Sequence, residues 1–385
     1  MQSFEKYKTW VEVSEQAIDA NLRVFQDIVS DNVKIIAVIK SNAYGHGLLE
    51  VAKIVSKQNI EYFAVDSLDE ALKLKKAGFQ QKVLILGYIP YERLLEAIKA
   101  NFSFVFYSTE ALSTIQELLK ENEFIQQVNV HLKIETGTNR QGLKGDDLID
   151  FVNKIKQIPK INIEGVYTHY ANVEDTTDQT YADYQLRNFQ KALEDLKEIG
   201  IDPEIKHTAC SAAALVKPES RFTHIRLGVS LYGLWSSAET KATAENKYQD
   251  IVLSPALTWK TVIVQIKHVA KREFIGYGLT ARVERDSKIA VLPIGYWDGY
   301  DRKMSNKGRV LINGQYCSII GRICMNMCMV DVTDISNVAI RDEVVLLGKD
   351  NFGNMITAED FAQDINTINY EVVTRINPQL PRIIV

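Results

Sequence analysis

The stretch IIAVIKSNAYGHG, residues 35–47, begins with a short apolar run and changes character at Lys40. The run Ile35–Ile39 is rich in β-branched residues and apolar at every position, which is typical of a parallel strand buried on both faces. An unpaired ammonium is costly to bury there, and a desolvated lysine can become a nucleophile or a Schiff-base partner. The alternative is a lysine whose ammonium simply reaches water. The stretch alone leaves both interpretations open.

Composition places the chain among ordinary soluble proteins. Its 385 residues predict two domains, and 46% apolar and 24% charged residues are usual for a globular protein. A net charge of −4 without a basic stripe argues against nucleic acid as a partner. We see no apolar signal segment and no run long enough to cross a bilayer. We therefore expect a cytoplasmic protein that does not associate with membranes.

The four cysteines do not form a metal-binding or disulfide pattern. Cys210, Cys317, Cys324 and Cys328 are scattered through a large chain, as is typical of reduced thiols in a cytosol. Cys324 and Cys328 are not spaced as a CxxC pair, and no histidine cluster accompanies them. We therefore expect no metal site.

Short apolar segments recur through the first two thirds of the chain. The segments predicted as strands are residues 34–40, 62–67, 83–88, 102–107, 128–136, 161–169, 204–209 and 223–229. Helix-like stretches separate them, such as 68–77 before the candidate cap Gly78, and 184–200. Strict alternation predicts a parallel sheet, and eight units predict a closed (β/α)8 TIM-type barrel in an α/β fold. An open doubly wound sheet is the competitor, but no G-x-G-x-x-G follows these strands.

The pattern changes after about residue 248. Residues 257–267 alternate with period two, and RVLINGQY at 309–316 carries an Asn-Gly hairpin turn. These features predict a mostly antiparallel β domain at residues 248–385, after a barrel at residues 1–247. The polar stretch 236–246 is interpreted as the linker, and residues 1–12 are candidates for pairing with the β domain.

Functionally capable residues fall at the carboxyl ends of the predicted barrel strands, where barrel enzymes carry their active sites. They are Lys40, Lys133 with Arg140 in the following loop, His169, Ser211 and Arg226. His169 alone is compatible with a core histidine, and Arg226 with an ion-pair partner, but convergence on one rim favours a common site. Ser211 and Gly228 follow the seventh and eighth strands, where barrels often bind phosphate. A Schiff-base lysine opposite a phosphate site predicts pyridoxal phosphate.

Ordered motifs across nearly the whole chain resemble the pyridoxal-phosphate-dependent alanine racemases of the barrel type. They are AVIKSNAYGHG at 37–47, THYA at 168–171, IRLG at 225–228, GYG at 276–278, IGY at 294–296, GRICM at 321–325 and INYE at 368–371. The resemblance implies an isomerase that interconverts L-alanine and D-alanine, with D-alanine supplied for peptidoglycan. It also implies a homodimer with shared active sites.

By this resemblance, two residues move the Cα proton from opposite faces of the substrate. Lys40 binds the cofactor as a Schiff base and serves as the base on one face. Tyr277, contributed by the partner subunit, is the base on the other face. A phenol is a weak base near neutral pH, and the resemblance supplies His169, backed by Arg226, to assist it. Without its flanking glycines, Tyr277 would read as an ordinary strand aromatic, one of 17 tyrosines.

The resemblance also assigns the cofactor's other contacts. Arg226 donates to the pyridine nitrogen and, being always protonated, leaves that nitrogen unprotonated and the ring a weaker electron sink. This arrangement suppresses transamination. The residues that match phosphate contacts are Tyr44, Ser211, Gly228, Val229 and Tyr370.

Four further residues match the substrate end of the family's site. Arg140 and the backbone N–H of Met325 match groups near the substrate carboxylate, and Tyr296 narrows the entrance from the partner chain. Lys133 matches a lysine that is often carbamylated in the family. A plain ion-pairing lysine is the alternative at this position.

Three positions depart from the family's pattern near the entrance or substrate pocket. Asn326 stands where Asp is usual, and Trp297 stands where a small residue is common. Ala281 stands where an aromatic residue often follows the sequence Gly-x-Thr. They leave the proton-transfer residues intact and keep open a racemase of serine or of larger amino acids. A decarboxylase of the same fold is disfavoured by Arg226 and by the lack of a Glu-Pro-Gly-Arg motif. A non-catalytic cofactor-binding protein is disfavoured by the complete β domain with Tyr277.

Overall fold

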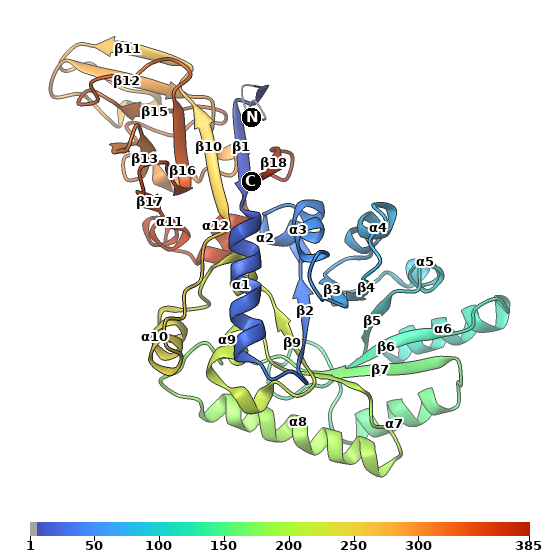
Figure 1. The fold of residues 1–385 in the computed structure, drawn as a ribbon. Coiled ribbons are helices and arrows are strands. Elements are labelled where there is room, and N and C mark those ends of the chain that lie inside the picture. Colours follow the sequence, from blue (N-terminus) through green and yellow to red (C-terminus); the bar gives the residue numbers. More distant parts are fainter. Residues whose placement is uncertain (1–5) are drawn as a thin grey trace. The chain divides into compact units, whose positions relative to one another are not determined.

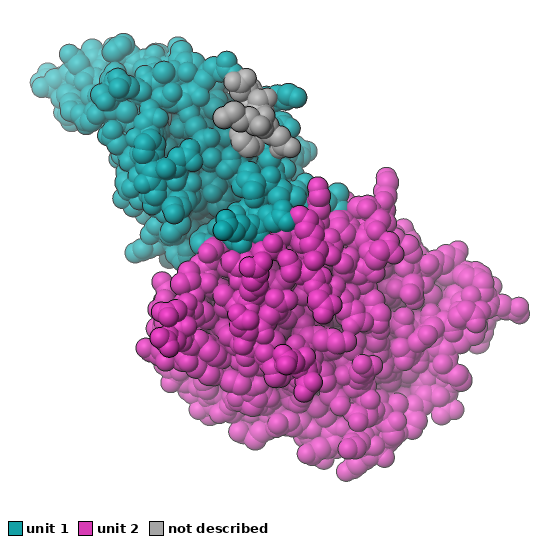
Figure 2. Space-filling model, in the orientation of Figure 1, with its two compact units in different colours: residues 1–17, 42–51, 255–385 teal, residues 18–41, 52–254 magenta. Residues whose placement is uncertain are grey.

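The computed structural model describes residues 6–385, which form two compact units (Figures 1 and 2). Unit 1 comprises residues 1–17, of which 6–17 are described, together with 42–51 and 255–385. Unit 2 comprises residues 18–41 and 52–254. The chain therefore passes between the units more than once.

Unit 2 contains an eight-stranded parallel sheet with neighbours in the order β8-β7-β6-β5-β4-β3-β2-β9. Its strands are β2 (Lys34–Val38), β3 (Tyr62–Val65), β4 (Lys82–Ile85), β5 (Ser103–Phe106), β6 (Val128–Lys133), β7 (Ile161–Tyr167), β8 (Ile205–His207) and β9 (His224–Leu227). The N–H of Arg226 donates to the carbonyl of Ala209 at 2.9 Å, which joins β9 to the end of β8 and closes the barrel. All eight predicted strands are confirmed, with slightly earlier ends.

One helix precedes the first barrel strand, and the others lie between or after the barrel strands. They are α1 (Glu15–Ile28), α2 (Lys40–Tyr44), α3 (Leu48–Val55), α4 (Leu68–Lys76), α5 (Leu94–Lys99), α6 (Thr109–Glu121), α7 (Gly145–Lys156), α8 (Thr180–Glu198), α9 (Ser211–Val216) and α10 (Ala238–Lys247). In α4 the hydroxyl of Ser67 accepts from the N–H of Glu70, and Gly78, at φ 86°, follows the last turn as its predicted stop.

The stretch interpreted as a linker contains α10 instead of irregular chain. The side chain of Ser237 caps this helix by accepting from the N–H of Thr240. Only Thr240 and Ala244 are buried, so α10 lacks the broad apolar stripe that makes a surface helix visible in a sequence.

Unit 1 is built from two sheets. The larger sheet has the order β14-β13-β16-β10-β1-β18, with β17 paired to β16, and the smaller has the order β11-β12-β15. The strands are β1 (Thr9–Val13), β10 (Leu257–Val262), β11 (Gln265–Val269), β12 (Ser287–Leu292), β13 (Arg309–Ile312), β14 (Gln315–Ser318), β15 (Cys328–Asp331), β16 (Glu343–Lys349), β17 (Met355–Ile356) and β18 (Arg382–Ile384). β18 pairs parallel with β1, and the other strand pairings of the larger sheet are antiparallel, so this sheet is mostly antiparallel, as predicted.

The Asn-Gly turn joins β13 to β14 as predicted. Asn313 has φ 48° and Gly314 has φ 77°, the pair of positive values that a two-residue type I′ hairpin requires. Helices α11 (Ala358–Ile365) and α12 (Asn369–Thr374) lie between β17 and β18 in the sequence of unit 1.

Within residues 6–385, no helix is both long and apolar enough to span a membrane. The same residues bring together no group of three or more His, Cys, Asp or Glu side chains suited to a metal ion. The four cysteines are free thiols.

Candidate active site

The residues predicted at the ends of the barrel strands gather at one rim of unit 2. Lys40 follows β2 and begins α2, and Lys133 is the last residue of β6. His169 follows β7, Ser211 begins α9 after β8, and Arg226 lies in β9. Parallel strands present their carboxyl ends at the same edge of a barrel, which is why residues so far apart in sequence meet.

Lys40 carries its amine to the mouth of the barrel. Its Nζ lies 3.6 Å from Oδ1 of Asp66, which follows β3, and 36% of the Lys40 side chain is exposed. The amine is therefore partly shielded but still reachable by a small molecule. Neither of the two interpretations of Lys40 describes it fully, because it is neither deeply desolvated nor free of a partner.

The backbone after Lys40 turns in the left-handed sense. Residues 41–44, none of them glycine, have φ between 52° and 55°. L-residues in this region cost about 1–2 kcal/mol each, and strain of this kind concentrates at functional sites. The side chain of Asn42 helps to hold the turn, because its Oδ1 accepts from the N–H of Leu48 at 3.0 Å. The turn separates Lys40, in unit 2, from Tyr44, in unit 1.

Tyr44 and Tyr370, two predicted phosphate ligands, lie together in unit 1. Their ring centroids are 6.2 Å apart. The backbone next to Tyr44 packs tightly against the helix of Tyr370. A Cβ added at Gly45 would lie only 2.0 Å from the carbonyl oxygen of Val373 in α12. Arg382 also donates to the Gly45 carbonyl at 3.0 Å. The two tyrosines are thus held in place by the backbone beside them.

The other predicted phosphate ligands meet at the ends of β8 and β9. The hydroxyl of Ser211 accepts from the N–H of Gly228 at 3.0 Å and from that of Ser230 at 3.4 Å. Ser211 and Val229 are each 3% exposed. The Ser211 hydroxyl, its lone pairs engaged by these N–H groups, is left to donate its own proton to an anion such as phosphate.

Arg226 is buried and donates to two histidine rings and to neighbouring backbone carbonyls. It donates through Nη1 to Nδ1 of His207 at 2.9 Å and to the His207 carbonyl at 2.7 Å. It donates through Nη2 to Nδ1 of His169 at 3.0 Å and to the carbonyls of Thr168 and Thr208. Burial and the adjacent guanidinium hold the pKa of both imidazoles well below the ordinary value. Both rings are therefore neutral acceptors that orient Arg226.

Lys133 is a buried amine among cations. It is 5% exposed, and its Nζ lies 4.2 Å from the centroid of the Tyr167 ring. Burial, reinforced by Arg226 and Arg140, holds the pKa of Lys133 well below the ordinary value. Nζ makes no hydrogen bond or ion pair with any residue of the described part of the chain. Arg140 itself is exposed, in the loop that follows β6.

The remaining predicted residues lie on exposed loops of unit 1. Tyr277 is 71% exposed, between Gly276 at φ 73° and Gly278 at φ 72°, so its loop adopts a course that requires glycine. Backbone contacts bring Tyr296 and Met325 together, because the N–H of Tyr296 donates to the Cys324 carbonyl at 3.1 Å. Both Tyr296 and Met325 are exposed.

The three departures from the pattern differ in their surroundings. Asn326 and Trp297 are exposed, and the N–H of Trp297 donates to the Met325 carbonyl at 3.0 Å. Ala281 instead packs against the small apolar cluster of Ile275, Val283 and Ile289.

Sequence reasoning missed two polar partners of the rim. Asp66, which pairs with Lys40, follows β3, and His207, which binds Arg226, ends β8. The rule that identified His169 also applies to them, because both lie at the carboxyl end of a barrel strand. The left-handed turn at 41–44 had no comparable signal.

Family models match both parts of the chain, alanine racemase N-terminal domain over residues 13–236 and alanine racemase C-terminal domain over residues 256–384. This chain belongs to the alanine racemase family. The alanine racemase of Methanococcus maripaludis is 37% identical, over 97% of this chain and 98% of that protein. Two solved structures are also similar. The alanine racemase of Bacillus anthracis with bound L-Ala-P has a TM-score of 0.90 and 34% identity, covering 98% of this chain and 95% of that one. A histidine racemase of Leuconostoc mesenteroides has a TM-score of 0.88 and 29% identity, covering 98% of each.

Proposed function

We propose that this member of the alanine racemase family interconverts L-alanine and D-alanine by moving the Cα proton between Lys40 and Tyr277. The observation that carries the proposal is Arg226, fixed between two neutral histidines at the rim that also holds Lys40. A permanently charged donor at the cofactor's ring nitrogen limits electron withdrawal, which favours returning the proton to Cα over transamination.

The donor set at the rim fits pyridoxal 5′-phosphate. Lys40 supplies the primary amine for the aldehyde, and Arg226 supplies the donor for the ring nitrogen. Ser211, Gly228 and Val229 supply donors for the phosphate, and the resemblance adds Tyr44 and Tyr370. When bound, the cofactor withdraws electrons from Cα and so acidifies its proton.

Two proton-handling groups must act on opposite faces of Cα, because the proton leaves one face and returns to the other. We assign one face to the Lys40 amine and the other to the Tyr277 phenol, with His169 and Arg226 supporting the phenol. Arg140, the Met325 N–H and Tyr296 orient the substrate and narrow its access. The Lys40 amine, partly exposed at the mouth of the barrel, supports this assignment.

We infer a homodimer in which Tyr277 and Tyr296 complete the partner's site. Large apolar or aromatic side chains gather on the exposed loops of unit 1, each more than 40% exposed: Tyr277, Leu279, Tyr296, Trp297, Met325 and Met327. Soluble monomers rarely expose so many side chains of this kind on neighbouring loops, so a covering surface is favoured. The free thiols support a cytoplasmic location, from which D-alanine can supply peptidoglycan.

We further propose that Lys133 is carbamylated. A neutral amine reacts with carbon dioxide, and burial beside Arg226 and Arg140 favours the neutral form of Lys133. The product carries a negative charge, which those two arginines would stabilise rather than oppose.

A broader amino-acid range is the second candidate. Asn326 beside Met325 removes a negative charge at the substrate end, and the histidine racemase likeness shows that this fold also accepts a larger substrate. Alanine remains the first candidate, because the Methanococcus maripaludis and Bacillus anthracis relatives, which match over nearly their full length, are alanine racemases.

The test is to load purified protein with pyridoxal phosphate and follow circular dichroism of L-alanine, L-serine, L-lysine, L-arginine and L-histidine. We expect the alanine signal to decay to zero fastest, and the D-alanine signal to decay likewise. A higher rate on another amino acid would refute the alanine assignment, and release of carbon dioxide would indicate a decarboxylase. The visible absorbance of the lysine-bound cofactor should be lost in Lys40→Ala.

Tyr277→Phe tests the second base. We expect the cofactor absorbance to persist while racemisation slows by roughly 10²- to 10⁴-fold, the usual contribution of a positioned acid or base. Tyr316→Phe, at another exposed tyrosine of unit 1, is the matched control and should leave the rate unchanged. An unchanged rate in Tyr277→Phe would remove the phenol from the mechanism.

A further inference from the structure

Arg226 lies at one end of a chain of polar contacts that crosses the core of the barrel. Its Nη1 donates to Nδ1 of His207 at 2.9 Å. Nε2 of His207 lies 2.9 Å from Nδ1 of His131, in β6. Nε2 of His131 in turn lies 3.4 Å from Oε2 of Glu164, in β7. The chain therefore joins a buried guanidinium to a carboxylate through two imidazoles.

The chemistry of its two ends allows only one arrangement of protons along this chain. A guanidinium only donates, so Nδ1 of His207 accepts and the neutral ring carries its proton on Nε2. That proton is donated to Nδ1 of His131, which places the proton of His131 on Nε2, facing Glu164. A carboxylate only accepts, so every link points from Arg226 to Glu164. Burial lowers the pKa of both imidazoles, which keeps them neutral.

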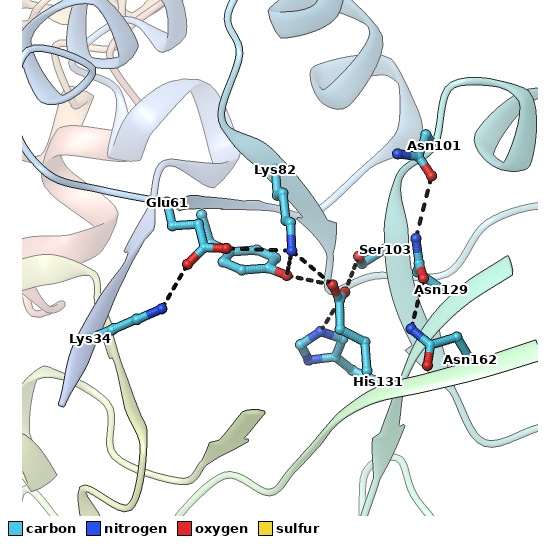
Figure 3. Close-up of polar contacts among 10 residues, drawn as sticks. Lys34, Glu61, Lys82, Asn101, Ser103, Asn129, His131 and Asn162 are labelled. Atoms are coloured by element: carbon cyan, nitrogen blue, oxygen red, sulfur yellow. Dashed lines mark hydrogen bonds and ion pairs between the residues drawn. The ribbon is translucent and has the colours of Figure 1, made fainter. Parts of the chain in front are cut away.

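Glu164 is held in the charged form by donors from neighbouring strands, and Figure 3 shows Lys82, Ser103 and His131 of this cluster. Tyr62 donates to its carboxylate at 2.6 Å, Ser103 at 2.5 Å and Lys82 at 3.2 Å. Tyr62, Lys82 and Ser103 are the first residues of β3, β4 and β5. Burial alone raises the pKa of Glu164, but the adjacent His131 and the hydrogen bonds from Ser103 and Tyr62 outweigh burial and hold the pKa well below its usual range.

Two local features of the β6–β7 pair fix the positions of Glu164 and His131. Val130 pairs with Ile163 whereas His131 pairs with Gly165, so Glu164 is the extra residue of a bulge. Bulges re-aim side chains, often beside functional sites. A Cβ at Gly165 would lie 2.4 Å from Nδ1 of His131, so the ring rests directly on the glycine.

We propose that Glu164 and His131 are positioning residues for Arg226, acting through His207 from the far end of the barrel. The inference rests on the proposed function, because it assumes that Arg226 faces the cofactor's ring nitrogen. Arginine keeps its proton at all accessible pH values, so the chain cannot conduct protons to the site. Its role is to orient the guanidinium and to place a counter-charge behind it.

The competing explanation is that Glu164 only stabilises the barrel, as residues at the amino-terminal face commonly do. The first measurement tests the proton arrangement on which the proposal depends, without any variant or substrate. In ¹⁵N-histidine-labelled protein, NMR should show His131 and His207 neutral, each protonated on Nε2 and bare on Nδ1, from pH 6 to pH 9. The opposite tautomer or a protonated ring at either position overturns the proposal. Loss of all racemase activity would refute the proposed function yet leave this result standing.

The second measurement compares Glu164→Gln with Glu61→Gln in the cofactor-loaded enzyme. A glutamine amide donates as well as accepts, so Glu164→Gln removes the single polarity of the chain and its counter-charge. We expect the His131 resonances to shift and the cofactor absorbance to be retained. The kcat should fall by roughly 10- to 100-fold, with little change in KM. Glu61 pairs with Lys34 at 3.1 Å and Lys82 at 3.4 Å, in the same cluster. Its replacement removes an equal charge and should change neither readout.

The proposal is overturned if Glu164→Gln leaves the resonances or kcat unchanged, or if both variants lower kcat equally. Should Glu164→Gln fail to fold, Tyr62→Phe removes the 2.6 Å hydrogen bond while keeping the carboxylate. It should shift the same His131 resonances by a smaller amount and lower kcat by a smaller factor. Unchanged resonances in Tyr62→Phe would overturn the proposal equally.

Discussion

Lys133 shows how strongly one buried amine depends on its neighbours. The charges of Arg226 and Arg140 add to the effect of burial, so the ammonium form is disfavoured. An uncharged lysine in such a place is either a costly inert group or a site for covalent modification. The proposed carbamylation would replace the neutral amine with an anion that both arginines attract.

We expect protein equilibrated with ¹³C-bicarbonate to show a carbamate resonance that disappears in Lys133→Met. The kcat of that variant should fall roughly tenfold or more, since the arginines lose a counter-charge worth at least about 1.4 kcal/mol. Lys144→Met, at an exposed lysine of the loop before α7, is the control and should keep both the resonance and the rate. A resonance that survives in Lys133→Met would contradict carbamylation at this position.

Single residues of the site were predictable where topology determines their place. Lys40, His169 and Arg226 were identified because parallel strands deliver their carboxyl ends to one rim. His131 and Glu164 lie within strands rather than at that rim, and the chain that they form depends on a bulge and on ring tautomers. Neither a bulge nor a tautomer leaves a pattern that a single sequence reveals.

The motif that follows β2 combines a left-handed backbone with close packing against a neighbouring helix. Residues 41–44 turn in the left-handed sense, and Gly45 continues at φ 84° with the Val373 carbonyl directly beside its Cα. Gly78 has nearly the same φ, 86°, but nothing lies within 4 Å of a Cβ built there. Comparing substitutions at the two glycines therefore separates the free-energy cost of a positive φ from the cost of a steric clash.

We expect Gly78→Ala to lower the free energy of unfolding by about 1–2 kcal/mol, the cost of a left-handed L-residue. Gly45→Ala should cost roughly 1–3 kcal/mol more, because its Cβ must displace the backbone of α12. Urea unfolding of both variants measures the difference. Equal losses would mean that α12 moves freely and that the close packing at Gly45 is unimportant.

Some helices, strands and turns could be predicted from the sequence and others could not. The β13–β14 hairpin was predicted because a two-residue type I′ turn needs positive φ at both positions, which Asn-Gly supplies. Helix α10 was not predicted, because its polar face dominates and only two of its residues are buried. The left-handed turn was not predicted either, because four non-glycine residues give no sign of positive φ.

Burial of histidines affects the stability of the whole molecule. Burial lowers the pKa of His46, His131, His169, His207 and His224, with His46 and His224 reaching about 4. In the unfolded chain each would titrate near pH 6.5. Below pH 6.5 and down to about 4, the unfolded state therefore binds more protons than the folded state, and stability falls as the pH falls.

We expect the free energy of unfolding to decrease from pH 7 to pH 5 by up to about 1.4 kcal/mol per pH unit for each buried histidine. Urea unfolding at fixed protein concentration across this range measures the slope. His224→Gln should reduce the slope, because it removes one of these buried rings. A stability that stays constant from pH 7 to pH 5 would contradict the neutral state of these rings.

The most direct test of the two-base, shared-site account is complementation between Lys40→Ala and Tyr277→Phe. Co-expressed chains with different tags allow the mixed dimer to be purified away from the two homodimers. Each homodimer lacks one base in both sites, whereas the mixed dimer has one site with both bases and one with neither. We predict almost no racemisation by either homodimer and roughly half of the native activity in the mixed dimer. A mixed dimer no more active than the homodimers would show that Lys40 and Tyr277 do not meet across subunits.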